Sequence, residues 1–233
     1  MYTFETKIGY SKTGCDLEMT IPAILESFQD AATFESQEGK ITMEYLQERN
    51  LVWFLSAWQI VINRKPKMNE TVKVTTYPYE FKGFLGYRNF VITTIHDEIL
   101  IKGNSVCTLI NTRNMHPQKV NAEIMEGYEL EDRLDMDYAP RKIELTSEGV
   151  EKQKFKVYSY QIDSNCHMNN VEYVKLAMEL IPGDKLIKQV RVEYKNPAYC
   201  GDIITSILYL EDKIIKVKLQ GDDGRIFAIV EFE

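Results

Sequence analysis

The chain has 233 residues, a formal net charge of -7 and a hydrophobic content of 44%. These values are typical of a globular protein with one large domain or two small ones. The acidic balance argues against nucleic acid as the main partner, because binding to phosphates needs a basic face. An acidic protein partner would likewise need a local basic patch on this chain.

The first half of the chain predicts a strand, two helices and then four strands. Residues 2–9 alternate as a strand does, and Thr20 is a helix N-cap followed by apolar residues at helical spacing. Gly39 is expected to end an irregular stretch after this helix, and Thr42 to cap a short second helix. Runs rich in β-branched and aromatic residues predict strands at 51–63, 71–80, 84–96 and 98–110.

A segment of different composition separates the two halves of the chain. From Glu123 to Asp137 there are seven acidic residues and one basic residue. We interpret residues 116–150 as a solvated linker with a short helix near 120–127, rather than as an acidic docking tail. The predicted domains are then residues 1–115 and residues 151–233.

The second half repeats the order of the first. A strand at 154–161 leads into a polar loop and a helix at 169–180, which Pro182, Gly183 and Asp184 are expected to stop. Four strands follow, at 187–196, 202–211, 212–219 and 225–232. The repeated order predicts an α+β architecture in which each half wraps an antiparallel sheet around a long helix.

The cysteines and the apolar runs point to a cellular compartment. Cys15, Cys107, Cys166 and Cys200 are widely spaced and form no C-x-x-C motif, which indicates free thiols in a reducing compartment. No apolar run approaches the roughly 18 residues of a membrane span, and the N-terminus holds no apolar signal segment. We therefore expect a cytoplasmic protein without a membrane span.

The densest group of reactive side chains is the run Asp163–Asn170, directly before the second long helix. It holds a carboxylate, three carboxamides, a thiol and His167, one of only three histidines. First-turn N–H groups and the helix dipole favour negative charge developing on a bound carbonyl group. The alternative is a solvated loop in which Asn169 or Ser164 only caps the helix.

This run, Asp-x-Asn-x-His-x-Asn-Asn-x-x-Tyr, resembles the active-site signature of acyl-acyl-carrier-protein thioesterases. Three residues match the catalytic residues of that family: Asp163, Asn165 and His167. Three more match flanking family positions: Asn169, Asn170 and Tyr173. The likeness continues through Phe28-Gln29, a strand that carries Trp58, and the strand Gly86–Phe90, so that it covers nearly the whole chain.

The resemblance implies a tandem (double) hot-dog fold and a hydrolase that converts acyl-acyl-carrier-protein thioesters to free fatty acid and holo-carrier protein. It implies the carrier protein as partner and no metal or cofactor. The acyl chain would enter the N-terminal domain, where Phe28 and Trp58 are candidates to contact it, and Asn169 and Asn170 are candidates to contact the thioester. The oligomeric state is left open, with a homodimer as one option.

Thioester hydrolysis requires an activated water, a polarised carbonyl and a thiolate leaving group. A histidine such as His167 can act as base or relay at neutral pH. Asp163 can orient the imidazole or itself activate the water, and Asn165 can position the water or stabilise an oxyanion. Which of Asp163 and His167 activates the water is left open. The other two histidines, His96 and His116, lie in turn-like settings.

A cysteine mechanism is the rival, because Cys166 precedes His167. Many plant-type members of the resembled family carry Glu-Cys where this chain has Pro197 and Ala198. The departure favours attack by water, and the run from Pro197 resembles the turn of acyl-CoA hot-dog thioesterases. An acyl-CoA thioesterase and a non-catalytic acyl-binding protein are therefore the alternatives.

Docking of an acidic carrier protein would require cations on this acidic chain. Two clusters are candidates: Arg64-Lys65-Pro66-Lys67, and the spaced residues Lys185, Lys188, Arg191 and Lys195. The alternative is that these are solvated charges at turns and strand ends.

Overall fold

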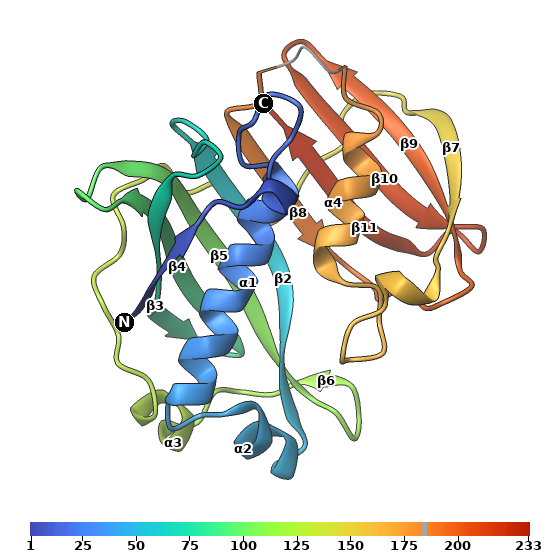
Figure 1. Ribbon diagram of the computed structural model, residues 1–233. Helices are drawn as coiled ribbons and strands as arrows, with labels where there is room; N and C mark the ends of the chain where they lie inside the picture. Colours follow the sequence, from blue (N-terminus) through green and yellow to red (C-terminus); the bar gives the residue numbers. More distant parts are fainter. Residues whose placement is uncertain (183–185) are drawn as a thin grey trace. The chain divides into compact units, whose positions relative to one another are not determined.

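The computed structural model describes residues 1–182 and 186–233, which divide into two compact units (Figure 1). Unit 1 comprises Met1–Ser56 and Ile60–Ala139, and unit 2 comprises Ala57–Gln59 and Pro140–Glu233. The change from unit 1 to unit 2 after Ala139 falls inside the segment 116–150 that the sequence marks as a linker. In each unit a long helix lies against an antiparallel sheet, as predicted (Figure 1).

The strands of unit 1 lie in the order β1-β3-β4-β5-β2, with the short β6 beside β5. The long helix α1 crosses one face of this sheet and contacts β1 and β3. In the register of the sheet, Thr76 of β3 lies opposite Phe90 of β4. The elements are β1 (Tyr2–Lys7), η1 (Tyr10–Lys12), α1 (Ile21–Glu38), α2 (Met43–Glu48), β2 (Leu51–Ile62), β3 (Thr71–Lys82), β4 (Leu85–Thr94), β5 (Ile99–Asn111), β6 (His116–Pro117) and α3 (Ala122–Glu126).

Helix α1 begins as predicted but is longer than the sequence suggested. The Ala23 N–H donates to the Thr20 hydroxyl oxygen over 3.3 Å, which is the expected N-cap. The helix continues to Glu38, so Gly39 ends the helix itself and the predicted irregular stretch is wrong. Phe28 is fully buried, with its ring 5.0 Å from that of Phe90. An added Cβ at Gly103 of β5 would lie 2.7 Å from the Phe28 ring, so only glycine lets α1 approach the sheet this closely.

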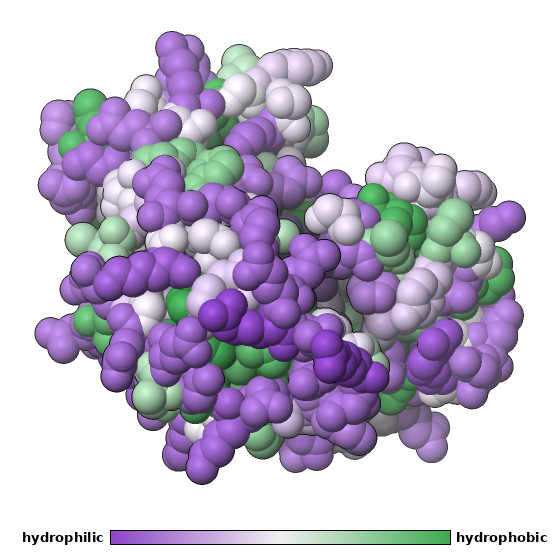
Figure 2. Space-filling view, turned by 90° about the horizontal axis from the view of Figure 1, so that it is seen from below, coloured by the Kyte–Doolittle hydropathy of each residue, from purple (hydrophilic) through white to green (hydrophobic). Residues whose placement is uncertain are grey.

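A second, smaller core attaches α2 and α3 to the sheet of unit 1. Its buried residues are Ile41, Leu46, Leu109, Val120 and Ile124. Trp53 packs against them, stacks on Phe81 at 5.9 Å and donates its indole N–H to the Tyr128 hydroxyl over 3.2 Å. Figure 2 shows one face of the molecule, on which hydrophobic residues lie in small groups between hydrophilic ones.

The strands of unit 2 lie in the order β8-β11-β10-β9-β7, and α4 packs on β10 and β11. In this sheet Val217 of β10 lies opposite Val230 of β11. None of the helices in the described ranges combines the length and the apolar character that crossing a bilayer requires. The elements are β7 (Val150–Lys156), η2 (Ser159–Gln161), α4 (Asn170–Met178), β8 (Gln189–Tyr194), β9 (Ile203–Glu211), β10 (Ile214–Gly221) and β11 (Ile226–Phe232).

The boundaries of β7 and α4 differ from the sequence prediction. The strand predicted at 154–161 is wrong at both ends, because β7 begins at Val150, stops at Lys156 and is followed by a 3-10 turn at residues 159–161. The cause is local, since the Gln161 side chain accepts the Tyr158 N–H over 3.0 Å and turns the chain. Helix α4 ends at Met178. Two of the three residues predicted to stop it, Gly183 and Asp184, lie outside the described residues.

The connector after α3 contacts unit 1 through several hydrogen bonds, among them those of the buried Asn89 amide and that of the Glu131 N–H to the Pro78 carbonyl over 3.1 Å. The Asn89 side-chain oxygen accepts the Tyr138 hydroxyl over 2.9 Å and the Leu134 N–H over 3.1 Å. Asn89 is itself fully buried in β4. Leu134 and Tyr138 are half-buried at this contact, whereas residues 129–133 of the connector are exposed.

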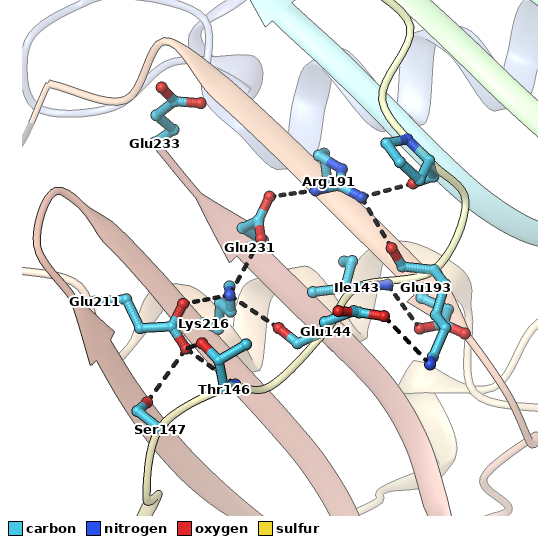
Figure 3. A network of polar contacts seen from close by, with 12 residues as sticks. Ile143, Glu144, Thr146, Ser147, Arg191, Glu193, Glu211, Lys216, Glu231 and Glu233 are labelled. Atoms are coloured by element: carbon cyan, nitrogen blue, oxygen red, sulfur yellow. Dashed lines mark hydrogen bonds and ion pairs between the residues drawn. The ribbon is translucent and has the colours of Figure 1, made fainter.

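Residues 140–147, here called the strap, lie along the sheet of unit 2 and are held there by charged side chains (Figure 3). Arg191 donates to the carbonyl of Pro140 over 2.6 Å, and Lys216 donates to the carbonyl of Glu144 over 2.8 Å. The N–H of Ile143 donates to the Glu193 carboxylate over 3.1 Å, and Ile143 is buried. Charged groups buried on a sheet need polar partners, and the strap backbone provides them.

Candidate active site

The predicted polar cluster forms a closed loop, Ile162–Asn169, between η2 and α4. The Asp163 N–H donates to the His167 carbonyl over 2.8 Å, and the Cys166 N–H donates to the Asp163 carbonyl over 3.0 Å. Cys166 has a φ of 62°, the left-handed conformation that lets the chain reverse here. The loop thereby pairs the backbones of Asp163 and His167.

The three predicted catalytic side chains keep most of their polar atoms available. One oxygen of the Asp163 carboxylate accepts the Asn165 N–H over 2.8 Å. Within the described residues, no hydrogen bond joins the side chains of Asp163, Asn165 and His167 directly to one another. Asp163 and His167 are half-buried, and Asn165 is exposed. The Asn165 amide and both ring nitrogens of His167 are therefore free to contact a substrate or a water.

One backbone N–H group in the first turn of α4 has no hydrogen-bond partner among the described residues. The Asn169 side-chain oxygen accepts the Val171 N–H over 2.9 Å, so Asn169 and not Ser164 is the N-cap. The Glu172 N–H donates to the Asn169 carbonyl over 3.0 Å. The Asn170 N–H makes no hydrogen bond to the described part of the chain, and it lies at the positive end of the helix dipole.

A segment after β8 supports the loop from the side. The Met168 N–H donates to the Ala198 carbonyl over 2.9 Å, and the Ala198 N–H donates to the Tyr173 hydroxyl oxygen over 2.8 Å. Burial raises the pKa of Tyr173 to about 12. The ring of the next residue, Tyr199, forms a T-shaped pair with the ring of His167, with ring centroids 5.1 Å apart. Sequence reasoning missed Tyr199, because no local pattern reports a contact between distant segments.

Unit 1 contains the same loop at the same place before its long helix. In the loop Thr13–Thr20, the Gly14 N–H donates to the Glu18 carbonyl over 2.9 Å, and the Leu17 N–H donates to the Gly14 carbonyl over 3.0 Å. Leu17 has a φ of 58°. The Met19 N–H donates to the carbonyl of Pro66, as Met168 does to Ala198 in unit 2. The two loops therefore share one backbone arrangement.

The side chains of the two loops differ at the three positions of the predicted catalytic residues. The loop of unit 1 has a glycine and two acids in the places of the predicted catalytic residues: Gly14, Asp16 and Glu18. Both acids pair with Lys65, at 3.0 and 3.6 Å. The loop conformation thus does not depend on an aspartate, an asparagine and a histidine at these positions. Asp163, Asn165 and His167 are therefore not required by the fold, and they stay the candidates for a functional role.

The residues predicted to contact the acyl chain lie away from solvent. Phe28 is enclosed by Phe90 and Gly103 of unit 1, and Trp58 is 4% exposed in β2. Both positions suit core packing as well as contact with an apolar ligand. Their role in binding stays a prediction.

The two candidate docking clusters are mostly neutralised inside the chain. Four of their cations pair with carboxylates of the same unit: Arg64 with Glu70, Lys65 with Asp16, Arg191 with Glu231, and Lys195 with Glu193. Lys185 lies outside the described residues. Paired cations add little to the attraction of an acidic partner.

Comparison with known proteins links this chain to a family. The model of the acyl-ACP thioesterase N-terminal domain matches residues 1–128, and that of the C-terminal domain matches residues 144–226. The chloroplastic acyl-[acyl-carrier-protein] hydrolase FATB3 of Cuphea viscosissima is 23% identical over 214 residues, which are 85% of this chain and 52% of that protein. The chain thus spans about half the length of the curated relatives it matches.

Solved structures share the architecture. An acyl-ACP thioesterase from Bacteroides thetaiotaomicron matches with a TM-score of 0.90 and 19% identity, over 99% of this chain and 96% of that chain. The 12:0-ACP thioesterase from Umbellularia californica matches with a TM-score of 0.87 and 19% identity, over 100% of this chain and 96% of that chain. These likenesses confirm the tandem hot-dog fold predicted from the sequence.

Proposed function

Because this chain belongs to the acyl-ACP thioesterase family, we propose that it hydrolyses the thioester of an acyl-acyl carrier protein. The products are a free fatty acid and the holo-carrier protein, so the reaction ends fatty acid synthesis on that carrier. The observation that carries the proposal is the difference between the two loops. Their backbones agree, but only the loop of unit 2 presents Asp163, Asn165 and His167.

In the proposed reaction, a water oxygen attacks the thioester carbonyl carbon while Asp163 or His167 takes the water proton. General acid–base groups of this kind typically contribute about 10²–10⁴-fold to the rate. The Asn165 amide positions the water or binds the oxyanion. The C–S bond then breaks, and the thiolate of the carrier leaves and takes up a proton.

The Asn170 N–H is the proposed donor to the carbonyl oxygen. It has no partner among the described residues and lies at the N-terminus of α4, where negative charge is favoured. Loss of one oxyanion donor costs about 3–4 kcal/mol of transition-state stabilisation in well-studied enzymes. The adjacent Asn169 is proposed to orient this peptide through its cap, with its amide N–H groups left to contact the substrate.

We assign the attack to water rather than to a cysteine. Ala198, which stands where many plant-type family members have a cysteine, contacts the loop through its backbone at Met168. Cys166 is exposed, and its left-handed backbone serves the reversal of the loop. Free thiols are compatible with the cytoplasmic location predicted from the sequence, which stays a prediction.

An acyl-CoA thioesterase is the second candidate. It is favoured by the run Pro197–Cys200, which resembles the turn of acyl-CoA hot-dog thioesterases, and by the internal pairing of the cationic clusters. The two candidate functions then differ in the group that carries the acyl chain, which is a carrier protein in one and CoA in the other. The chemistry at the loop is the same for both.

One experiment separates these functions. The purified chain is given the same palmitoyl group on an acyl carrier protein and on CoA, and release of free thiol is followed. A higher kcat/KM for the carrier-protein substrate supports the proposal, and a higher kcat/KM for palmitoyl-CoA supports the second candidate. If neither substrate releases thiol while palmitate still binds, the chain is a non-catalytic acyl-binding protein.

A further inference from the structure

We propose that Tyr199 is a positioning residue that holds the His167 imidazole in its reactive orientation. The inference rests on the proposed function, because it assigns a partner to the proposed base. The two rings meet edge to face, at 5.1 Å between centroids and 76° between planes. This is a preferred geometry for an aromatic pair, since the positive edge of one ring faces the negative face of the other.

The His167 side chain needs such a support. The hydrogen bonds that close the loop fix its backbone, through Asp163 and Met168, but they do not reach the imidazole. Within the described residues the ring nitrogens make no hydrogen bond, and the side chain is only half-buried. Packing against the ring of Tyr199 thus restricts rotation of an imidazole that no hydrogen bond holds in the described structure.

Tyr199 is itself held on both sides. Its N–H donates to the Asp202 carboxylate over 2.9 Å, and the Asp202 N–H donates back to the Tyr199 carbonyl over 3.0 Å. Asp202 is in turn 3.7 Å from the Arg225 guanidinium. The preceding residue, Ala198, is tied to Tyr173 of α4. The backbone beneath Tyr199 is therefore fixed to the helix and the sheet of unit 2.

Unit 1 shows that this support is not a requirement of the fold. The equivalent residue there is Lys67, whose N–H donates to the Glu70 carboxylate over 2.9 Å, as Tyr199 does to Asp202. Lys67 forms a backbone bridge with Glu18, which stands in the place of His167. The backbone is again the same, and the aromatic ring occurs only where the histidine occurs. The pairing of the two rings thus follows the site and not the fold.

The kinetic test uses two substitutions and a control. Tyr199→Ala should lower kcat on the thioester by roughly 2- to 10-fold, the range that an aromatic pair supplies, with KM little changed. Tyr199→Phe should keep wild-type kcat, because the phenol oxygen makes no hydrogen bond to the described residues. Tyr10→Ala, which removes an exposed tyrosine of η1 in unit 1, is the matched control and should change neither constant. Wild-type kcat in Tyr199→Ala, or an effect on KM alone, would overturn the proposal.

A second readout does not depend on turnover. The ring-proton resonances of His167, assigned by their loss in His167→Ala, should move in Tyr199→Ala and stay in place in Tyr199→Phe, since the ring current remains. Unchanged resonances in Tyr199→Ala would show that the rings do not pack in solution. If the wild-type chain hydrolyses no thioester, the proposed function fails, and the resonances still decide whether Tyr199 orders His167.

Discussion

The side-chain carboxylate of Glu211 holds the strap on the sheet of unit 2. Glu211 accepts hydrogen bonds from the Lys216 ammonium, from the Thr146 N–H at 3.3 Å and hydroxyl at 2.9 Å, and from the Ser147 hydroxyl at 3.2 Å (Figure 3). Glu211→Gln keeps the shape and one acceptor oxygen but removes the charge. Because a hydrogen bond to a charged group contributes about 1.5–3 kcal/mol, we expect unit 2 to lose about 2 kcal/mol of unfolding free energy at neutral pH.

The same substitution predicts a pH dependence. Hydrogen bonds from Lys216 and then from Thr146 lower the pKa of Glu211 from 4.5 to about 2 in the folded chain. A lowered pKa means that the carboxylate stabilises the fold fully above the unfolded value and loses this effect as pH falls toward the folded value. The difference between wild type and Glu211→Gln should therefore be constant above pH 4.5 and shrink between pH 4.5 and about 2.

Urea unfolding followed by far-UV circular dichroism, at several pH values, measures this difference. The matched control is Asp212→Asn, which removes the same charge one residue further on, where the side chain is exposed. The control should shift the unfolding free energy by less than about 0.5 kcal/mol. Equal effects of the two substitutions, or a difference that grows on acidification, would refute the reasoning.

Three further predictions follow from the described contacts. Arg88→Met should cost about 3–5 kcal/mol in urea unfolding, because it leaves the Glu35 carboxylate, 16% exposed, without its ion pair, and adding Glu35→Met should recover most of the loss. Cys166→Ala and Cys200→Ala should each retain most thioesterase activity, and trapping of an acyl group on either thiol would contradict attack by water. Asn169→Ala should lower stability by about 1 kcal/mol through loss of the α4 cap, whereas Asn169→Asp should lower it less, as measured by thermal melting.

Local patterns predicted most of the fold because the cause of each element is local. The N-caps at Thr20 and Thr42 are set by their own side chains and were predicted from residue type. Runs rich in β-branched and aromatic residues predicted the long strands of both sheets, with the exception of β7, which is displaced from the predicted range. The 3-10 turn before the loop was missed because it depends on the conformation of one side chain, Gln161, which competes with the strand pattern.

The features that were not predicted depend on contacts between segments that are distant in the sequence. The strap is ordered by side chains such as Arg191 and Lys216, whose alternation in their strands gives no sign of what covers them. In the site, the cluster at Asp163 was visible in the sequence because its residues are consecutive. The support from Tyr199 was not visible, because it depends on the pairing of Met168 with Ala198 across the fold.

The most direct test of the account compares equivalent positions of the two loops. His167→Ala and Glu18→Ala each replace the same position of one backbone arrangement, one in each unit. Steady-state hydrolysis of palmitoyl-acyl carrier protein should fall by about 10²–10⁴-fold in folded His167→Ala and remain near wild type in Glu18→Ala. Near-wild-type turnover in folded His167→Ala, or equal losses in both variants, would contradict the assignment of catalysis to the loop of unit 2.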